Sequence, residues 1–284
     1  MAQSDFSWAI PVMRAGYAGR ALVYLVVAGF SLWAIWQGGS ASGTSSSLEK
    51  LETTTGGGIV LFLIFAGMLC YAVWRIIDAI WDLEAYGSDG EGIVARLGMV
   101  TTGVIHGAIG VLAFTLLFTS GAGSGGGSSI TQGVDAVMSW PGGRWIVGLA
   151  GLLTIGAAVY YLHKAWKEKY REHLRANRFT MNWNGALKAG VAAQGVVVGI
   201  IGALFVYAAF TANPNEAGGV AEAFSWLNGQ PYGRILVAIV CVGLLGFALF
   251  CAVNAAYRIV PKAAGDDIET LAHRMKAKAE AAAN

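Results

Sequence analysis

Residues 187–210 read LKAGVAAQGVVVGIIGALFVYAAF, and no charged residue follows Lys188 within this stretch. A helix needs roughly 20 such residues to cross about 30 Å of hydrocarbon. Five other stretches have the same character: 16–36, 59–81, 97–118, 144–166 and 234–258. A backbone in lipid must satisfy its own hydrogen bonds, and these stretches lack the alternation of barrel strands. The sequence therefore predicts an all-α polytopic membrane protein with six transmembrane helices.

The composition agrees with a bilayer as the solvent. Of the 284 residues, 56% are hydrophobic and 13% are charged, whereas a soluble domain carries about 25% charged residues. The three cysteines, Cys70, Cys241 and Cys251, all lie within the apolar stretches. We interpret them as small apolar side chains and not as a disulfide set.

The chain contains three copies of a two-helix unit. A basic residue followed by a glycine two positions later opens the first helix of each unit, at Arg14, Arg96 and Lys188. We assign the units to residues 1–90, 91–180 and 181–262, with a C-terminal cytoplasmic helix in 263–284, predicted over 266–279 with Asp266 or Asp267 as its cap. Each unit also has one short amphipathic stretch between its spans, at 48–51, 134–138 and 220–227.

Two spans in each unit mean that every unit enters the membrane from the same side, so we expect three parallel helical hairpins. A pseudo-threefold ring is the simplest closed packing, and a linear row of hairpins also satisfies the sequence. Glycines spaced by three or four recur in the second and third units: Gly103, Gly107 and Gly110, and Gly195, Gly199 and Gly202. Small residues at this spacing let helix backbones approach in lipid, which predicts helix contacts at these faces.

Short motifs carry a resemblance. Arg14-Ala-Gly16-Tyr17 opens a first helix, while Pro141-Gly-Gly143-Arg144 and Pro231-Tyr-Gly233-Arg234 open second helices. This plan resembles a bacterial membrane family known as domain of unknown function 1206, whose units pair these two openings. The first unit departs from it, with Gly56-Gly57-Gly58 at the second opening. The resemblance covers nearly all of the chain up to Pro261; it implies the three-unit fold and implies no activity.

The distribution of basic residues sets the expected orientation. With the N-terminus inside, 16 Lys and Arg residues lie on the inner side and three, Lys50, Arg144 and Arg234, on the outer side. The excess of basic residues marks the cytoplasmic side. We therefore expect a multi-pass protein of the bacterial inner membrane with both termini cytoplasmic. The segment 167–175 is predicted to continue the fourth span as a solvated helix.

Several polar residues within or beside the spans are candidate binding residues: Arg75, Asp78, His106, Lys164, Gln194 and Asn254. Arg75 and Asp78 are three apart on one helical face and can pair. The repeat aligns Asp78 with Lys164 and Asn254, so these three would lie at one depth. Either they close the inner rim as structural groups, with Lys164 reaching toward headgroups, or they gate the passage of an ion or small solute.

His106 lies deeper in its span than the other candidates. A hydrogen bond to a hydroxyl of a neighbouring helix explains it, and an intramembrane enzyme around it is a further hypothesis. His163 lies at a different depth, which argues against a haem held by both histidines. Gln194, equivalent to Thr102 and Arg20 near the inner surface, is expected to hydrogen-bond across helices. His173 and His273 are predicted to be solvated.

Arg14, Arg96 and Lys188 would form a cationic ring at the inner interface that attracts anionic lipid headgroups. The sequence contains no phosphate loop, zinc-ligand spacing, nucleophile elbow or Cys-x-x-Cys motif. We therefore assign no catalytic residue, metal or cofactor, and expect no nucleic-acid partner. We predict a non-enzymatic scaffold or accessory subunit that binds lipid or a protein partner, or an oligomer. The alternative is a small-solute or ion channel or transporter.

Overall fold

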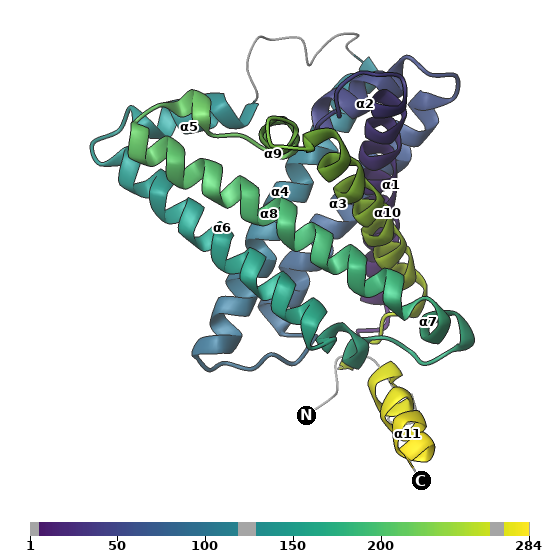
Figure 1. The fold of residues 1–284 in the computed structure, drawn as a ribbon. Coiled ribbons are helices and arrows are strands. Elements are labelled where there is room, and N and C mark those ends of the chain that lie inside the picture. Colours follow the sequence, from purple (N-terminus) through teal and green to yellow (C-terminus); the bar gives the residue numbers. More distant parts are fainter. Residues whose placement is uncertain (1–5, 119–128, 262–269, 284) are drawn as a thin grey trace.

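The computed structural model describes residues 6–118, 129–261 and 270–283 (Figure 1). Within these ranges, six helices are long and apolar enough to span a membrane: α1 (Ala9–Trp36), α3 (Gly57–Trp81), α4 (Gly90–Phe118), α6 (Gly143–Trp166), α8 (Asn184–Thr211) and α10 (Gly233–Tyr257). At 1.5 Å per residue their lengths are about 36–43 Å, more than the hydrocarbon thickness. The all-α, six-span prediction is confirmed.

The remaining helices lie at the two ends of the bundle. One end, which we call the loop face, carries the short helices α2 (Thr44–Glu52), η2 (Pro214–Glu216), α5 (Ser129–Met138) and α9 (Val220–Asn228). The three predicted amphipathic stretches lie within α2, α5 and α9. The opposite end, the termini face, carries η1 (Lys169–His173), α7 (Arg178–Asn182) and α11 (Leu271–Ala283).

One prediction about the termini face needs correction. The segment 167–175 does not continue α6, because Glu168 adopts a left-handed conformation with φ of 53° and a 3₁₀ helix follows. The chain becomes extended at Leu174 after this helix. The carbonyl of His173 accepts from Ile259, and Arg175 donates to the carbonyl of Tyr257. The C-terminal helix is present as α11, and its predicted caps at Asp266 and Asp267 lie outside the described residues.

The six long helices form an open arc and not a closed ring. Extensive packing joins α4 to α3, α3 to α1, α1 to α10, α10 to α8 and α8 to α6. The hairpins of the first and third units, α1–α3 and α8–α10, are therefore packed. In the second unit, α4 and α6 do not pack along one another, and each packs instead on a helix of a neighbouring unit (Figure 1).

Residue size at one crossing point explains this difference between equivalent hairpins. In the first unit Gly19 meets Gly67, where a Cβ on Gly19 would lie 2.6 Å from the Cα of Gly67. In the third unit the equivalent positions are Ala193 and Gly243, where a Cβ on Gly243 would lie 2.4 Å from the Cβ of Ala193. The second unit has Thr101 and Leu153 at these positions, and both are exposed. Helices with larger side chains at the crossing cannot approach as closely.

The glycine ladders pack as predicted, but they join neighbouring units and not the helices of one hairpin. A Cβ on Gly103 would lie 3.1 Å from the Cβ of Arg75 on α3, and one on Gly195 would lie 3.1 Å from the Cβ of Tyr161 on α6. The same face of the odd helix therefore contacts the preceding unit in both cases. These contacts hold α4 and α6 at the two ends of the arc.

Candidate functional site

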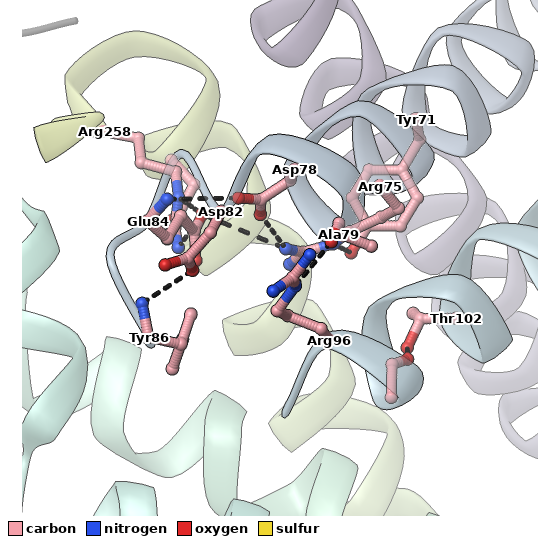
Figure 2. A network of polar contacts seen from close by, with 12 residues as sticks. Tyr71, Arg75, Asp78, Ala79, Asp82, Glu84, Tyr86, Arg96, Thr102 and Arg258 are labelled. Atoms are coloured by element: carbon pink, nitrogen blue, oxygen red, sulfur yellow. Dashed lines mark hydrogen bonds and ion pairs between the residues drawn. The ribbon is translucent and has the colours of Figure 1, made fainter. Parts of the chain in front are cut away.

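A buried ionic network lies where α3 ends at the termini face (Figure 2). Arg75 Nη1 lies 3.2 Å from Asp78 Oδ2, so the pair expected from the sequence is present. Glu84, in the connection after α3, accepts from Arg258 Nε at 2.8 Å and from Arg258 Nη2 at 2.5 Å. Arg75 Nη1 lies 3.8 Å from the same Glu84 oxygen. Both carboxylates are almost fully buried.

The network joins the first unit to the end of the third. Asn254 accepts from Arg258 Nη1 at 2.6 Å through its Oδ1 atom, and the backbone N–H of Glu84 donates to Asp78 at 3.1 Å. Asp78 and Asn254 are thus brought into one cluster. Lys164 is not part of it: its Nζ lies 5.8 Å from the centroid of the Tyr160 ring. The structure therefore joins two of the three residues in one cluster, and their common depth stays a prediction.

The charges of this network determine the protonation of its members outside the spans. Burial alone would raise the pKa of Glu84, but Arg258 and Arg75 outweigh burial and lower this pKa to about 2. His173 is half-buried and stacks on Tyr86, with ring centroids 6.4 Å apart. Burial and the positive charge of Arg258 lower the pKa of His173 to about 4. The prediction that His173 is solvated is therefore wrong.

A second polar centre lies in the middle of the arc, around Arg20. This side chain is 4% exposed and donates from Nη1 to the Tyr71 hydroxyl at 2.8 Å and from Nη2 to the Tyr161 hydroxyl at 3.4 Å. Its guanidinium carbon lies 5.1 Å from the ring centroids of Tyr71 and Phe247, and 5.7 Å from that of Tyr24. Among the described residues no carboxylate lies within ion-pair distance of Arg20.

The start of α1 gives the place of Arg20 along its helix. Helix α1 begins at Ala9, so Arg20 lies about 16 Å from the first residue of the helix at 1.5 Å per residue. Its depth relative to the inner surface stays a prediction.

Gln194 and His106 flank this centre. Gln194 donates from Nε2 to the Tyr24 hydroxyl at 2.9 Å, the hydrogen bond across helices that was expected. The ring of His106 packs on Tyr71 with centroids 4.9 Å apart. Its Nδ1 lies 2.8 Å from the carbonyl of Thr102 on its own helix, so the expected hydroxyl partner from a neighbouring helix is wrong. His163 is exposed and does not join His106.

The three cations expected at the lipid interface have different environments. Arg14 is exposed. Arg96 donates from Nε to the carbonyl of Ala79 at 2.5 Å and from Nη2 to that of Ile80 at 3.0 Å (Figure 2), and so caps the end of α3. Lys188 lies 3.5 Å from Glu168. Two of the three cations therefore have partners in the protein, and the attraction of the ring to anionic headgroups stays a prediction.

The predicted site residues thus fall into two clusters and several separate positions. The termini-face network gathers Arg75, Asp78 and Asn254, and the central group gathers His106 and Gln194. Within the described ranges, no three His, Cys, Asp or Glu side chains are grouped so that they would hold a metal ion.

Sequence reasoning missed Arg20, Glu84 and Arg258 as site residues. Glu84 and Arg258 lie just beyond helix ends, and 174 residues separate them, so no local pattern relates them. Arg20 carried a usable signal: it is the charged member of a repeat set whose other members are Thr102 and Gln194. A charge that occurs in only one of three equivalent positions marks a feature that packing alone does not require.

Comparisons with known proteins agree with the repeat. The family model described as Domain of Unknown Function (DUF1206) matches residues 15–82, 97–168 and 189–258. The chain is also 25% identical, over 260 residues, to the Uncharacterized protein YxxB of Bacillus subtilis (strain 168), an alignment that covers 90% of this chain and 94% of that protein. No solved structure matches. With three matches on three two-span units, this multi-pass membrane protein belongs to the DUF1206 family.

Proposed function

We propose that the protein is a non-enzymatic scaffold or accessory subunit of the bacterial inner membrane, with both termini cytoplasmic. The observation that supports this role is the open second unit. The first and third units bury the hairpin contact through close approach of small residues, whereas the equivalent Thr101 and Leu153 are exposed. This leaves two helix faces, on α4 and α6, that a partner can occupy.

The polarity of these faces fits an apolar partner. α6 is the least buried of the six spans, since only 17% of its most apolar 18-residue stretch is buried. Its Leu149, Leu152 and Leu153 side chains are more than half exposed. A lipid chain or a transmembrane helix of another protein satisfies such a surface, since neither brings unpaired polar groups into the hydrocarbon. Small residues at Gly98 and Ala157, both exposed, would let a helix backbone come close.

Site-specific photo-crosslinking in native membranes tests this proposal. A photoreactive residue at Leu153 on α6 or Thr101 on α4 is expected to give the same adduct, identified by mass spectrometry as one lipid class or one protein. The matched control is Ile239 on α10, which is 62% exposed but lies in a unit whose hairpin is closed. The same set of adducts at all three positions, with no enrichment of any component at the second unit, would overturn the proposal.

A channel or transporter for small solutes is the second candidate. Polar groups at membrane depth favour it: Arg20, His106 and Gln194 are all more than 90% buried in the middle of the arc. Against it, two depressions among the described residues, one lined by Ile35 and Arg234 and the other by Trp140 and Arg144, contain none of these polar groups. Vesicles reconstituted with the protein would carry an ion or solute flux that Asp78→Asn changes; an unchanged flux would exclude the proposed gate.

A further inference from the structure

Arg20 is a buried cation without a matching anion. The central and termini-face groups together contain three arginines, Arg20, Arg75 and Arg258, and two carboxylates, Asp78 and Glu84. Arg75 pairs with Asp78, and Arg258 pairs with Glu84. One positive charge, that of Arg20, is left over within the bundle of membrane-spanning helices. An uncompensated charge there is costly and marks a functional position.

The groups around Arg20 are hydrogen-bond donors. Its Nε atom is buried and has no hydrogen-bond partner among the described residues. The Tyr71 hydroxyl accepts from both Arg20 and Arg75, at 2.8 and 3.0 Å, so its own proton is available for a third group. The Tyr161 hydroxyl likewise accepts from Arg20. A guanidinium edge and two hydroxyl protons form a set that matches the oxygens of a phosphate or carboxylate.

The three aromatic rings that flank the guanidinium carry no net charge, so they lower the cost of its burial without neutralising it. They do hold the plane of the guanidinium in one orientation, which prepares its Nε edge for two parallel hydrogen bonds with one ligand. The rings thus make Arg20 a rigid donor at little additional entropy cost.

An approach to this centre lies on the side of α6. Helix α6 packs on α8 and makes no extensive contact with α1, α3 or α4. Its Tyr161 is only partly buried, and the 3.4 Å hydrogen bond to Arg20 is the longer of the two that Arg20 makes. Tyr161 is therefore the partner that Arg20 would release more easily, and its movement would free a guanidinium donor on the side of α6.

We propose that Arg20, with Tyr71 and Tyr161, binds an oxyanion that enters between α4 and α6. The shared chemistry is a phosphate group, which either a free anion or an anionic lipid headgroup supplies. The inference does not depend on the scaffold role, because it rests on Arg20 and its neighbours and not on the faces of α4 and α6 that carry Thr101 and Leu153.

Ligand-dependent unfolding of the purified full-length protein tests the site. The transition is followed by tryptophan fluorescence in a neutral detergent, with inorganic phosphate as one probe and phosphatidylglycerol as the other. We expect one of them to raise the unfolding temperature of the unaltered protein in a saturable way. A response to inorganic phosphate identifies a free anion, and a response to phosphatidylglycerol alone identifies a headgroup; either supports the site.

Variants locate the response. Arg20→Gln is expected to weaken the binding of the probe at least tenfold. Arg20→Lys should weaken it about as much, because it keeps the charge but loses the planar set of guanidinium donors. Arg178→Gln is the matched control, since Arg178 is exposed at the termini face and should leave the response unchanged. Arg14→Gln is measured beside it as the test for binding at the surface, because Arg14 belongs to the cations expected to attract headgroups. If Arg20→Gln does not fold, Tyr161→Phe should still weaken binding several-fold, because it removes one donor.

Three results would overturn the inference. One is that neither probe stabilises the unaltered protein. Another is that the Arg20 variants respond to the probe as strongly as the unaltered protein does. Where the Arg20 variants do not fold, the same result in Tyr161→Phe counts instead. The last is a response that Arg14→Gln removes while the interior variants keep it, which would place the binding at the surface and leave the scaffold proposal untouched.

Discussion

Arg258 donates two hydrogen bonds to a single carboxylate oxygen of Glu84, 174 residues earlier in the chain. The contact joins the connection after α3 to Arg258, the residue that follows α10 in the third unit. Since α1 lies between these helices in the arc, this ion pair closes the first and third units over α1 at the termini face. Both side chains are nearly fully buried, with 1% and 4% exposed.

Breaking this pair should be strongly destabilising. Glu84→Gln or Arg258→Gln leaves one buried charge without its partner, at a cost of about 3–5 kcal/mol. Thermal unfolding in detergent measures the loss. The double variant should cost less than the sum of the two single variants, because it leaves no lone charge. Glu172→Gln, at an exposed position, serves as a control, and a loss of stability as large as that of Glu84→Gln would contradict the argument.

Acidification should destabilise the protein in a defined window through His173. Its pKa falls from an ordinary value of 6.5 to about 4 in the folded protein, because of burial and of Arg258. Between these values the unfolded chain binds a proton that the folded protein does not, so stability decreases as the pH falls from 6.5 toward 4. Glu84 acts in the same direction between pH 4.5 and about 2, since its folded-state pKa is the lower one.

Unfolding temperatures measured from pH 7 to pH 4 check the role of His173. His173→Asn should flatten the dependence on pH in this range, whereas replacement of the exposed His273 should preserve it. A dependence that is unchanged in His173→Asn would show that other groups cause it.

The crossing of α1 and α3 should not tolerate a methyl group. Gly19→Ala would place a Cβ 2.6 Å from the backbone of Gly67, and overpacking of this kind costs about 1–3 kcal/mol. Gly29 in the same helix has no atom within 4 Å of its Cβ position, so Gly29→Ala should cause no loss. Thermal unfolding of the two variants compares them directly; equal stability would show that the α1–α3 contact is looser than described.

Disulfide trapping should distinguish the closed contact from the open one. In a background without the three native cysteines, Gly199→Cys with Ala158→Cys should crosslink α8 to α6, because their Cβ positions are 3.4 Å apart. Thr101→Cys with Leu153→Cys should not crosslink α4 to α6. Electrophoretic mobility after mild oxidation shows whether each of the two cysteine pairs has formed a disulfide. Efficient crosslinking of the second pair would mean that the second hairpin is closed.

The proposed orientation predicts which loops face outward. In the same cysteine-free background, Thr53→Cys at the loop face should react with an impermeant maleimide in spheroplasts, whereas Glu172→Cys at the termini face should react only after permeabilisation. Both positions are exposed, so access to the reagent alone decides the result. The reverse pattern would place the termini outside.

Much of the fold could be predicted because hydrocarbon imposes simple rules. Each apolar run had to be a helix. The helices α3, α6 and α10 begin at Gly57, Gly143 and Gly233, within two residues of the predicted starts of these spans. The starts of α1 and α4 were set too late, by seven residues, because a helix continues past the charge-free part into the interface. The glycine ladders predicted real contacts, since only small residues allow such approach.

The sequence by itself determined the solvent, the number of spans and the threefold repetition. These features depend only on the length, polarity and spacing of single segments, which decide whether each segment is stable as a helix in hydrocarbon. Only the tertiary structure decided that the second hairpin stays open, that Glu84 meets Arg258, and that Arg20 lies without a carboxylate. These facts depend on which residues of distant helices come together, and a one-residue difference in size or charge at a crossing point is enough to change that.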